Sequence, residues 1–158
     1  PLLHREIDAF LEQVKSLGYS VKLDTNGSFP DHLISLVENG LVDRVAMDIK
    51  NSKEKYHKTI GTENVTLEAV DASINYLLNN DLVDYEFRTT IIEEFHTDED
   101  MLNIASWVGG AKRFFLQHYV DREDCIAHGF HDVSKEKALH WKAILSKEIQ
   151  EVNIRGYD

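Results

Sequence analysis

The sequence contains a single cysteine, Cys125, among its 158 residues. One thiol cannot form a disulfide within the chain, and it cannot supply the several thiolates that a cysteine-only metal site needs. The sequence also contains no apolar run of roughly 20 residues, the length that a membrane-spanning helix requires, and no signal-peptide pattern. These absences predict a cytoplasmic chain without disulfides and without membrane association.

Basic residues are scarce relative to acidic ones. The chain has 17 Lys and Arg against 28 Asp and Glu, which gives a net charge of −11 at pH 7. Nucleic-acid binding needs clustered Lys and Arg to neutralise phosphates, and such clusters are missing, so we expect no nucleic-acid partner. Hydrophobic residues make up 42% and charged residues 28%, a balance typical of globular proteins. The length suits one domain with its own core, so we expect residues 1–158 to form a single domain.

Helix and strand patterns alternate along the chain. Apolar residues at helical spacing, with capping residues at their ends, predict helices over residues 3–18, 30–40, 66–78, 97–108 and 134–149. Short runs rich in β-branched and aromatic residues predict strands over residues 20–25, 44–49, 85–92, 113–120 and 152–154. Such alternation builds right-handed β-α-β units. The expected fold class is therefore α/β with a mainly parallel sheet, either open and doubly wound or part of a barrel.

Polar side chains gather where four of the predicted strands end. In a parallel sheet the carboxyl ends of the strands share one edge, and α/β proteins hold their ligands there. These strand ends would supply carboxylates, cations, amides and a histidine to one site. The candidate site residues are Asp24, Thr25, Asn26, Asp48, Lys50, Arg88, Gln117 and His118.

Each of these signals also has a structural explanation. The sequence Asp-Thr-Asn-Gly, which begins at Asp24, has the composition of a tight turn. Asp48 and Lys50 lie two residues apart and could form an exposed ion pair worth roughly 0–1 kcal/mol. Arg88 could pair with Glu86 in the same way. The four strand ends taken together favour a ligand site.

The remaining histidines carry a weaker signal. Cys125, His128 and His131 have the spacing C-x2-H-x2-H, which is compatible with metal binding. The surrounding polar segment, residues 121–133, fits an unliganded surface loop, a lid or a detached edge equally well, and we favour a loop without metal. Charged neighbours on helices or turns predict solvated side chains for His4, His32, His57, His96 and His140.

Four segments of the chain resemble successive strand ends of the radical S-adenosylmethionine (SAM) activases of glycyl radical enzymes. The segments are Leu23–Gly27, Met47–Lys50, Phe87–Thr90 and Phe115–Gln117. This family includes the pyruvate formate-lyase activating enzymes and the anaerobic ribonucleoside-triphosphate reductase activating proteins. The order and separation of the segments match the family, and the resemblance covers nearly the whole chain. Asp-Thr-Asn-Gly followed by Met-Asp-Ile-Lys is its most specific part.

The resemblance implies a partial (β/α)6 radical SAM barrel of the TIM type that lacks its first strands. It implies an enzyme that cleaves SAM reductively with a [4Fe–4S] cluster and abstracts hydrogen from a glycine of its partner, with a flavodoxin or ferredoxin as electron donor. The family holds its cluster on a Cys-x3-Cys-x2-Cys loop and the SAM amino group on a Gly-Gly-Glu-Pro strand end. Pro1–Leu3 resembles the end of that second motif. We therefore expect the cluster ligands to be absent from this chain and the chain alone to be inactive. We also expect it to self-associate, either by pairing of its open edge strand or by burial of its open barrel face in a neighbour.

The resemblance also implies roles for individual residues. Asp24, Thr25 and Asp48 match positions around a monovalent cation beside the SAM carboxylate, and Asn26 belongs to the same motif. Asp48 and Lys50 match an Asp-x-Lys pair that holds the methionine part of SAM. The other matches, near the cofactor, are Arg88, Gln117 and His118. The alternative function is a non-catalytic α/β module that retains a SAM-like or anion-binding pocket.

Overall fold

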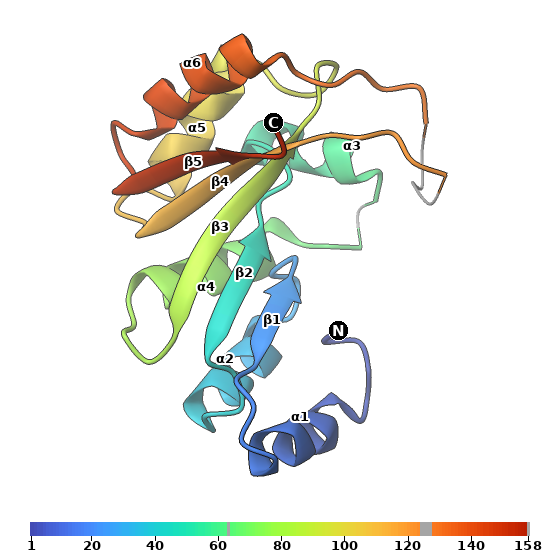
Figure 1. The fold of residues 1–158 in the computed structure, drawn as a ribbon, viewed down its shortest axis with the longest axis vertical. Helices are drawn as coiled ribbons and strands as arrows, with labels where there is room; N and C mark the ends of the chain where they lie inside the picture. Colours follow the sequence, from blue (N-terminus) through green and yellow to red (C-terminus); the bar gives the residue numbers. More distant parts are fainter. Residues whose placement is uncertain (63, 124–127, 158) are drawn as a thin grey trace. The chain divides into compact units, whose positions relative to one another are not determined.

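The computed structural model describes residues 1–62, 64–123 and 128–157. Five parallel strands form one sheet in the order β1-β2-β3-β4-β5, and helices alternate with them along the chain (Figure 1). The predicted α/β class with a parallel sheet is therefore confirmed. The chain groups into two compact units, which are described in turn: Pro1–Asp48 with Thr62–Glu86, and Ile49–Gly61 with Phe87–Asp158.

The first unit contains the beginning of the sheet and three helices. Its elements are α1 (Ile7–Ser16), β1 (Lys22–Thr25), α2 (Pro30–Glu38), β2 (Arg44–Asp48), α4 (Leu67–Leu78) and the start of β3 (Asp84–Ile91). The hydroxyl of Thr66 accepts a hydrogen bond from the Ala69 N–H at 3.3 Å, which satisfies a free donor at the start of α4. In the core of this unit α2 and α4 contact each other, and the helix side chains Leu33, Leu36 and Leu77 are fully buried.

A buried carboxylate lies at the amino-terminal ends of the strands in this unit. The Glu86 side chain is 2% exposed, and its Oε2 lies 2.8 Å from Nη2 of Arg44. Lys22, which is level with Arg44 in the parallel register, approaches the other oxygen at 3.6 Å. Glu86 therefore pairs with these two cations. Because the ligand end of a parallel sheet is its carboxyl end, this cluster serves stability.

The second unit contains the rest of the sheet and its covering helices. Its elements are η1 (Lys53–Lys55), α3 (Tyr56–Ile60), the remainder of β3, α5 (Asp98–Trp107), β4 (Arg113–His118), α6 (Lys135–Leu145) and β5 (Glu151–Arg155). Here α5 and α6 lie side by side, and α6 packs on β5 (Figure 1). Thr97 and Asp100 form a reciprocal capping box at the start of α5. The short helices η1 and α3 lacked a long apolar period and were not predicted.

Helix α1 differs from its prediction. Turns in which the His4 and Ile7 N–H groups donate to Pro1 and His4 carbonyls precede it, so the helix begins at Ile7 instead of residue 3. Of its apolar residues only Leu11 is buried, while Phe10 is 59% and Leu17 73% exposed. In the described part of the chain, no helix combines the length and the apolar character that crossing a bilayer demands.

Candidate functional site

In the first unit, two of the predicted acidic residues lie on the same face of the sheet. The parallel register places Asp24 beside Ala46. Side chains alternate between the two faces along a strand, so Asp48, two residues beyond Ala46, leaves the same face as Asp24. Asp24 is exposed and Asp48 is half-buried. The structure thus brings two carboxylates together as diagonal neighbours at the carboxyl ends of β1 and β2.

The next two candidates shape the turn after β1. The Thr25 side chain leaves the face opposite to Asp24 and is 7% exposed. Its Oγ1 accepts a hydrogen bond from the Gly27 N–H at 3.1 Å. The Asn26 Oδ1 accepts from the N–H and the hydroxyl of Ser28, at 3.1 and 2.7 Å. The turn interpretation therefore accounts for both side chains, and the structure does not bring the Thr25 hydroxyl to the face that carries Asp24.

In the second unit, Arg88 and Gln117 lie on one face of the sheet. Arg88 is level with Phe115 in the register, and Gln117 follows two residues later on the same strand. Both side chains are half-buried. Arg155, which is level with Gln117 on β5, joins this face, and its guanidinium carbon lies 3.9 Å from the centre of the Phe115 ring. Sequence reasoning missed Arg155 because the predicted last strand ended one residue earlier.

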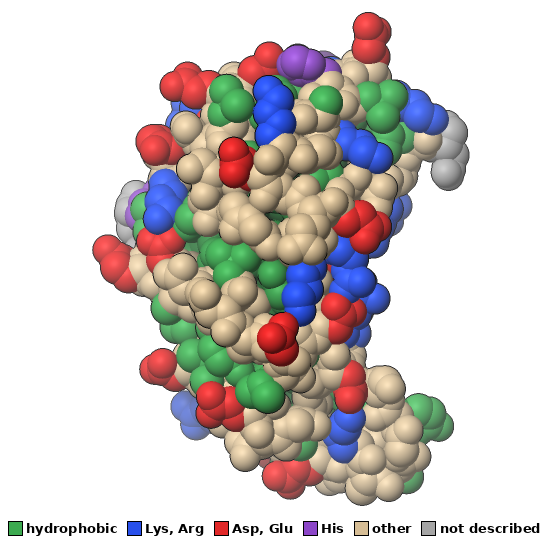
Figure 2. Space-filling view, turned by 90° about the vertical axis from the view of Figure 1, so that its left-hand side faces the viewer, with side chains coloured by type: hydrophobic (Ala, Val, Ile, Leu, Met, Phe, Trp, Pro, Cys, Tyr) green, Lys and Arg blue, Asp and Glu red, His purple; other side chains and the backbone are tan. Residues whose placement is uncertain are grey.

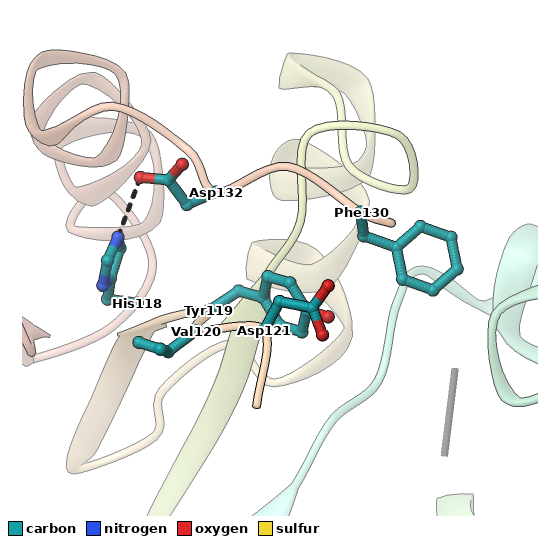
Figure 3. Close-up of a pocket in the computed structure, with 6 residues that line it drawn as sticks. All are labelled: His118, Tyr119, Val120, Asp121, Phe130 and Asp132. Atoms are coloured by element: carbon teal, nitrogen blue, oxygen red, sulfur yellow. Dashed lines mark hydrogen bonds and ion pairs between the residues drawn. The ribbon is translucent and has the colours of Figure 1, made fainter. Parts of the chain in front are cut away.

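His118 follows Gln117 and leaves the opposite face of β4. Its Nε2 lies 2.9 Å from Oδ2 of Asp132 (Figure 3). Its ring contacts the Tyr157 ring, with centroids 4.5 Å apart. The hydrogen bond from His118 holds the pKa of Asp132 below its ordinary value. The structure thus separates His118 from the face of Arg88 and Gln117, although all three were predicted to lie together.

A pocket of about 310 Å³ opens at the end of β4. The residues that line it are His118, Tyr119, Val120, Asp121, Phe130 and Asp132 (Figure 3). Residues 118–121 form one wall of the pocket, and Phe130 and Asp132 form the other. This other wall contacts the chain after β3 through a β-bridge between Ile92 and Asp132, and through the Phe95 and Phe130 rings, whose centroids lie 4.8 Å apart. Two carboxylates and aromatic rings suit a ligand with a cationic or aromatic part.

The C-x2-H-x2-H spacing is only partly visible, because Cys125 lies outside the described residues. His128 Nδ1 lies 2.8 Å from Asp121 Oδ1, and His131 Nδ1 lies 2.6 Å from Glu94 Oε1. Within residues 1–62, 64–123 and 128–157, no three candidate metal ligands come together. Both imidazoles are therefore paired with carboxylates. Figure 2 shows that acidic and basic side chains are interspersed on the face of the molecule that it draws.

The residues around Lys50 run beside β3 in the second unit. The Ile49 N–H donates to the Arg88 carbonyl at 2.8 Å, and the Thr89 hydroxyl donates to the Ile49 carbonyl at 2.7 Å. The Lys50 carbonyl lies 3.0 Å from Nε2 of His96. His96 was predicted to be solvated, and this prediction is wrong: the residue is 2% exposed. Its burial comes from tertiary packing against this segment, which local sequence does not reveal.

Comparison with known proteins shows the superfamily to which the chain belongs. Residues 1–108 match the radical SAM superfamily, and the chain belongs to this superfamily. Membership implies a partial TIM-like barrel, and it implies SAM and an iron–sulfur cluster as the reactive groups. The radical SAM superfamily predicted from the sequence is thereby confirmed.

A relative with a more specific name is found among curated proteins. Over 126 residues the chain is 31% identical to a protein of Methanocaldococcus jannaschii named "Putative glycyl-radical enzyme activating enzyme". The match covers 73% of this chain and 50% of that protein, so the chain spans about half the length of the relative.

The residues present fit one of the two implied groups. SAM carries a carboxylate, an ammonium and a sulfonium, so its site needs side chains of both signs. Taken separately, the first unit has the carboxylates Asp24 and Asp48 at its strand ends, and the second has the cations Lys50 and Arg88. A four-iron cluster instead needs several cysteine thiolates, and the sequence has one cysteine. The residues of this chain therefore do not fit the cluster.

Proposed function

We propose that this chain forms the SAM-binding part of a radical SAM activase that generates a glycyl radical on a partner enzyme. The observation that carries the proposal is the resemblance of Asp-Thr-Asn-Gly and Met-Asp-Ile-Lys to two strand ends of the glycyl-radical-enzyme activases. The name of the relative, which refers to glycyl-radical enzyme activation, agrees with it. The proposed partner is an anaerobic ribonucleotide reductase or a pyruvate formate-lyase type enzyme. A flavodoxin or ferredoxin would supply electrons, and the complete protein would work in the cytoplasm.

Each unit contributes its own side chains to this function. For the first unit, we propose that Asp24 and Asp48 bind a monovalent cation, with Thr25 shaping the adjoining turn, and that Asp48 also accepts hydrogen bonds from the methionine ammonium of SAM. The shared face of the two carboxylates supports this role. The Thr25 hydroxyl accepts the Gly27 N–H on the opposite face, so its part is to hold the turn.

For the second unit, we propose that the Lys50 ammonium binds the SAM carboxylate and that the Arg88 guanidinium neutralises charge near it. Gln117 would donate hydrogen bonds to SAM or accept them on the same face, whereas His118 leaves the opposite face and lines the separate pocket in Figure 3. When bound, SAM supplies a sulfonium whose reductive cleavage starts the radical chemistry. The side chains of this chain bind and orient SAM and limit the access of water to it.

The proposed function is tested with the intact protein that contains this chain. Reduced protein is mixed anaerobically with SAM and, separately, with each candidate glycyl radical enzyme, and electron paramagnetic resonance follows the organic radical. We expect a glycyl radical on one candidate, lost when its acceptor glycine is changed to alanine. Binding of SAM without any SAM cleavage would instead support the non-catalytic module. Cleavage of SAM without a radical on any candidate would contradict the activase function while leaving the superfamily intact.

A further inference from the structure

A buried histidine contacts the backbone of a proposed SAM-binding residue. His96 is 2% exposed, and its ring lies near Trp141, with centroids 6.4 Å apart. Its Nε2 lies 3.0 Å from the Lys50 carbonyl oxygen, across 46 positions of sequence. A buried polar ring needs hydrogen-bond partners. Here one partner is the backbone carbonyl of Lys50, whose ammonium is proposed to bind the SAM carboxylate.

The hydrogen bonds of His96 define its tautomer. The Ile92 N–H donates to Nδ1 at 3.1 Å, which requires a lone pair on that nitrogen. The proton of the neutral ring is therefore on Nε2, which donates to the Lys50 carbonyl. The ring thus links the end of β3 to the residue at position 50 by two directed bonds.

The residues that follow Lys50 are anchored by two further buried polar side chains. Asn51 is 0% exposed and donates to the Phe95 carbonyl at 2.9 Å. Ser52 is 1% exposed, and its hydroxyl donates to Asp100 Oδ1 at 2.9 Å. Together with His96, these contacts hold three consecutive residues against the segment that runs from the end of β3 into the first turn of α5. Because the backbone of Lys50 is anchored, the position of its Cα is fixed, and this restricts where its half-buried side chain can reach.

We propose that His96 is a positioning residue for Lys50, and that it fixes the backbone from which the Lys50 side chain reaches the carboxylate of SAM. This inference rests on the proposed contact of Lys50 with SAM. A histidine that only filled the core and satisfied its own polar atoms could be replaced without changing how Lys50 contributes to SAM affinity, and this difference separates the two roles.

The charge state of His96 leaves its bond to Lys50 in place. Burial lowers the pKa of His96 below its ordinary value, against the opposing effect of its hydrogen bonds to Lys50 and Ile92. Asp100 raises this pKa and Lys55 lowers it. Protonation places a hydrogen on Nδ1, which then donates to the Ile92 carbonyl, 3.2 Å away, instead of accepting the Ile92 N–H. Because Nε2 donates to the Lys50 carbonyl in both charge states, the positioning does not depend on the charge of the ring.

The test uses the cluster-loaded intact protein and calorimetric SAM affinity. His96→Leu removes the donor, whereas His96→Gln keeps an N–H that can reach the Lys50 carbonyl and cannot titrate. Each is compared with wild type, with Lys50→Ala and with the corresponding double variant. Loss of the charge-assisted contact of Lys50 costs about ten- to hundredfold in affinity. We expect His96→Leu to weaken binding by at least about tenfold, and His96→Gln by less than about threefold.

The double variant separates positioning from general damage. If His96 acts through Lys50, adding His96→Leu to the Lys50→Ala variant should weaken SAM binding further by less than about threefold. Equal loss in both backgrounds, or no loss from His96→Leu, would overturn the inference. Unchanged affinity in Lys50→Ala alone would overturn the proposed SAM contact as well, so the two failures are distinguishable. Should His96→Leu not fold, His96→Phe takes its place, because it keeps a buried ring and lacks the donor. A loss of affinity of about tenfold is expected, and wild-type affinity in this variant would contradict the positioning role.

Discussion

The terminal methyl carbon of Met47 lies 2.0 Å from the position that a Cβ on Gly27 would occupy. Gly27 also has a φ of 75°, in the left-handed region, and its carbonyl accepts a 2.8 Å hydrogen bond from the Ser73 hydroxyl. The turn after β1 is thereby fixed against β2 and α4. This contact explains why the turn requires glycine at its last position.

Replacing Gly27 by alanine should therefore destabilise the protein. The left-handed backbone costs an alanine about 1–2 kcal/mol, and displacement of Met47 adds about 1–3 kcal/mol. Gly18→Ala is a matched control, because Gly18 has a φ of 83° and open space around its Cβ position. Urea unfolding should show a larger loss for Gly27→Ala, and equal losses would mean that Met47 moves aside at no cost.

Asp100 should stabilise the protein through its charge. Burial raises its pKa, but hydrogen bonds from Lys55, Thr97 and Ser52 outweigh this effect and hold the pKa below its ordinary value. The stabilisation is therefore present above the ordinary pKa and is lost as pH falls through the lowered one. Asp100→Asn should cost about 1.5–3 kcal/mol at pH 7, the range for charge-assisted bonds.

Glu99→Gln provides the control for Asp100, because Glu99 is exposed in the same turn of α5. We expect it to change the unfolding free energy by less than about 1 kcal/mol. Denaturation at pH 7 and pH 3 measures both variants. A loss from Asp100→Asn that is no larger than the control, or that is the same at both pH values, would contradict the role of the charge.

His131 should titrate above its ordinary range. The hydrogen bond and charge of Glu94 raise the pKa of His131 above 6.5, so the pair stabilises the fold below that value and loses its effect as pH rises through the raised pKa. Proton NMR should show the His131 midpoint moving down in Glu94→Gln. Glu93→Gln is the control, because Glu93 pairs with Lys137. An equal shift in both variants would exclude the specific pair.

The chain itself should assemble no stoichiometric iron–sulfur cluster. One thiol cannot replace the cysteines that hold four irons. Anaerobic reconstitution with iron and sulfide should therefore leave far less than one cluster per chain, and Cys125→Ser should not lower the bound iron further. About four irons per chain by elemental analysis would contradict this expectation.

Local signals predicted the elements of the fold well. Thr97 and Ser134 begin helices where the sequence placed them, because caps act on neighbouring N–H groups. The side-chain partners depended on tertiary structure. Glu86 bonds to Arg44, which lies 42 residues away, and His96 is buried by distant chain segments.

The candidate site was predictable as a set of strand ends, but its internal arrangement was not. Asp24 and Thr25 are neighbours in sequence and leave opposite faces, as do Gln117 and His118. Side chains alternate between the two faces in every strand. Which face meets the ligand depends on how the sheet packs, and the sequence does not reveal that packing. Arg155 was missed because strand ends are the least certain part of a sequence-based assignment.

SAM affinity of Lys50→Ala in the intact, cluster-loaded protein tests the central claim most directly. Lys58→Ala is the matched control, since Lys58 is an exposed lysine of the same unit. Loss of a charge-assisted contact should weaken calorimetric binding by about 1.5–3 kcal/mol, or roughly ten- to hundredfold, with melting temperature and the control almost unchanged. Wild-type affinity in Lys50→Ala, together with a large fall in its melting temperature, would contradict the account and make Lys50 part of a structural ion pair.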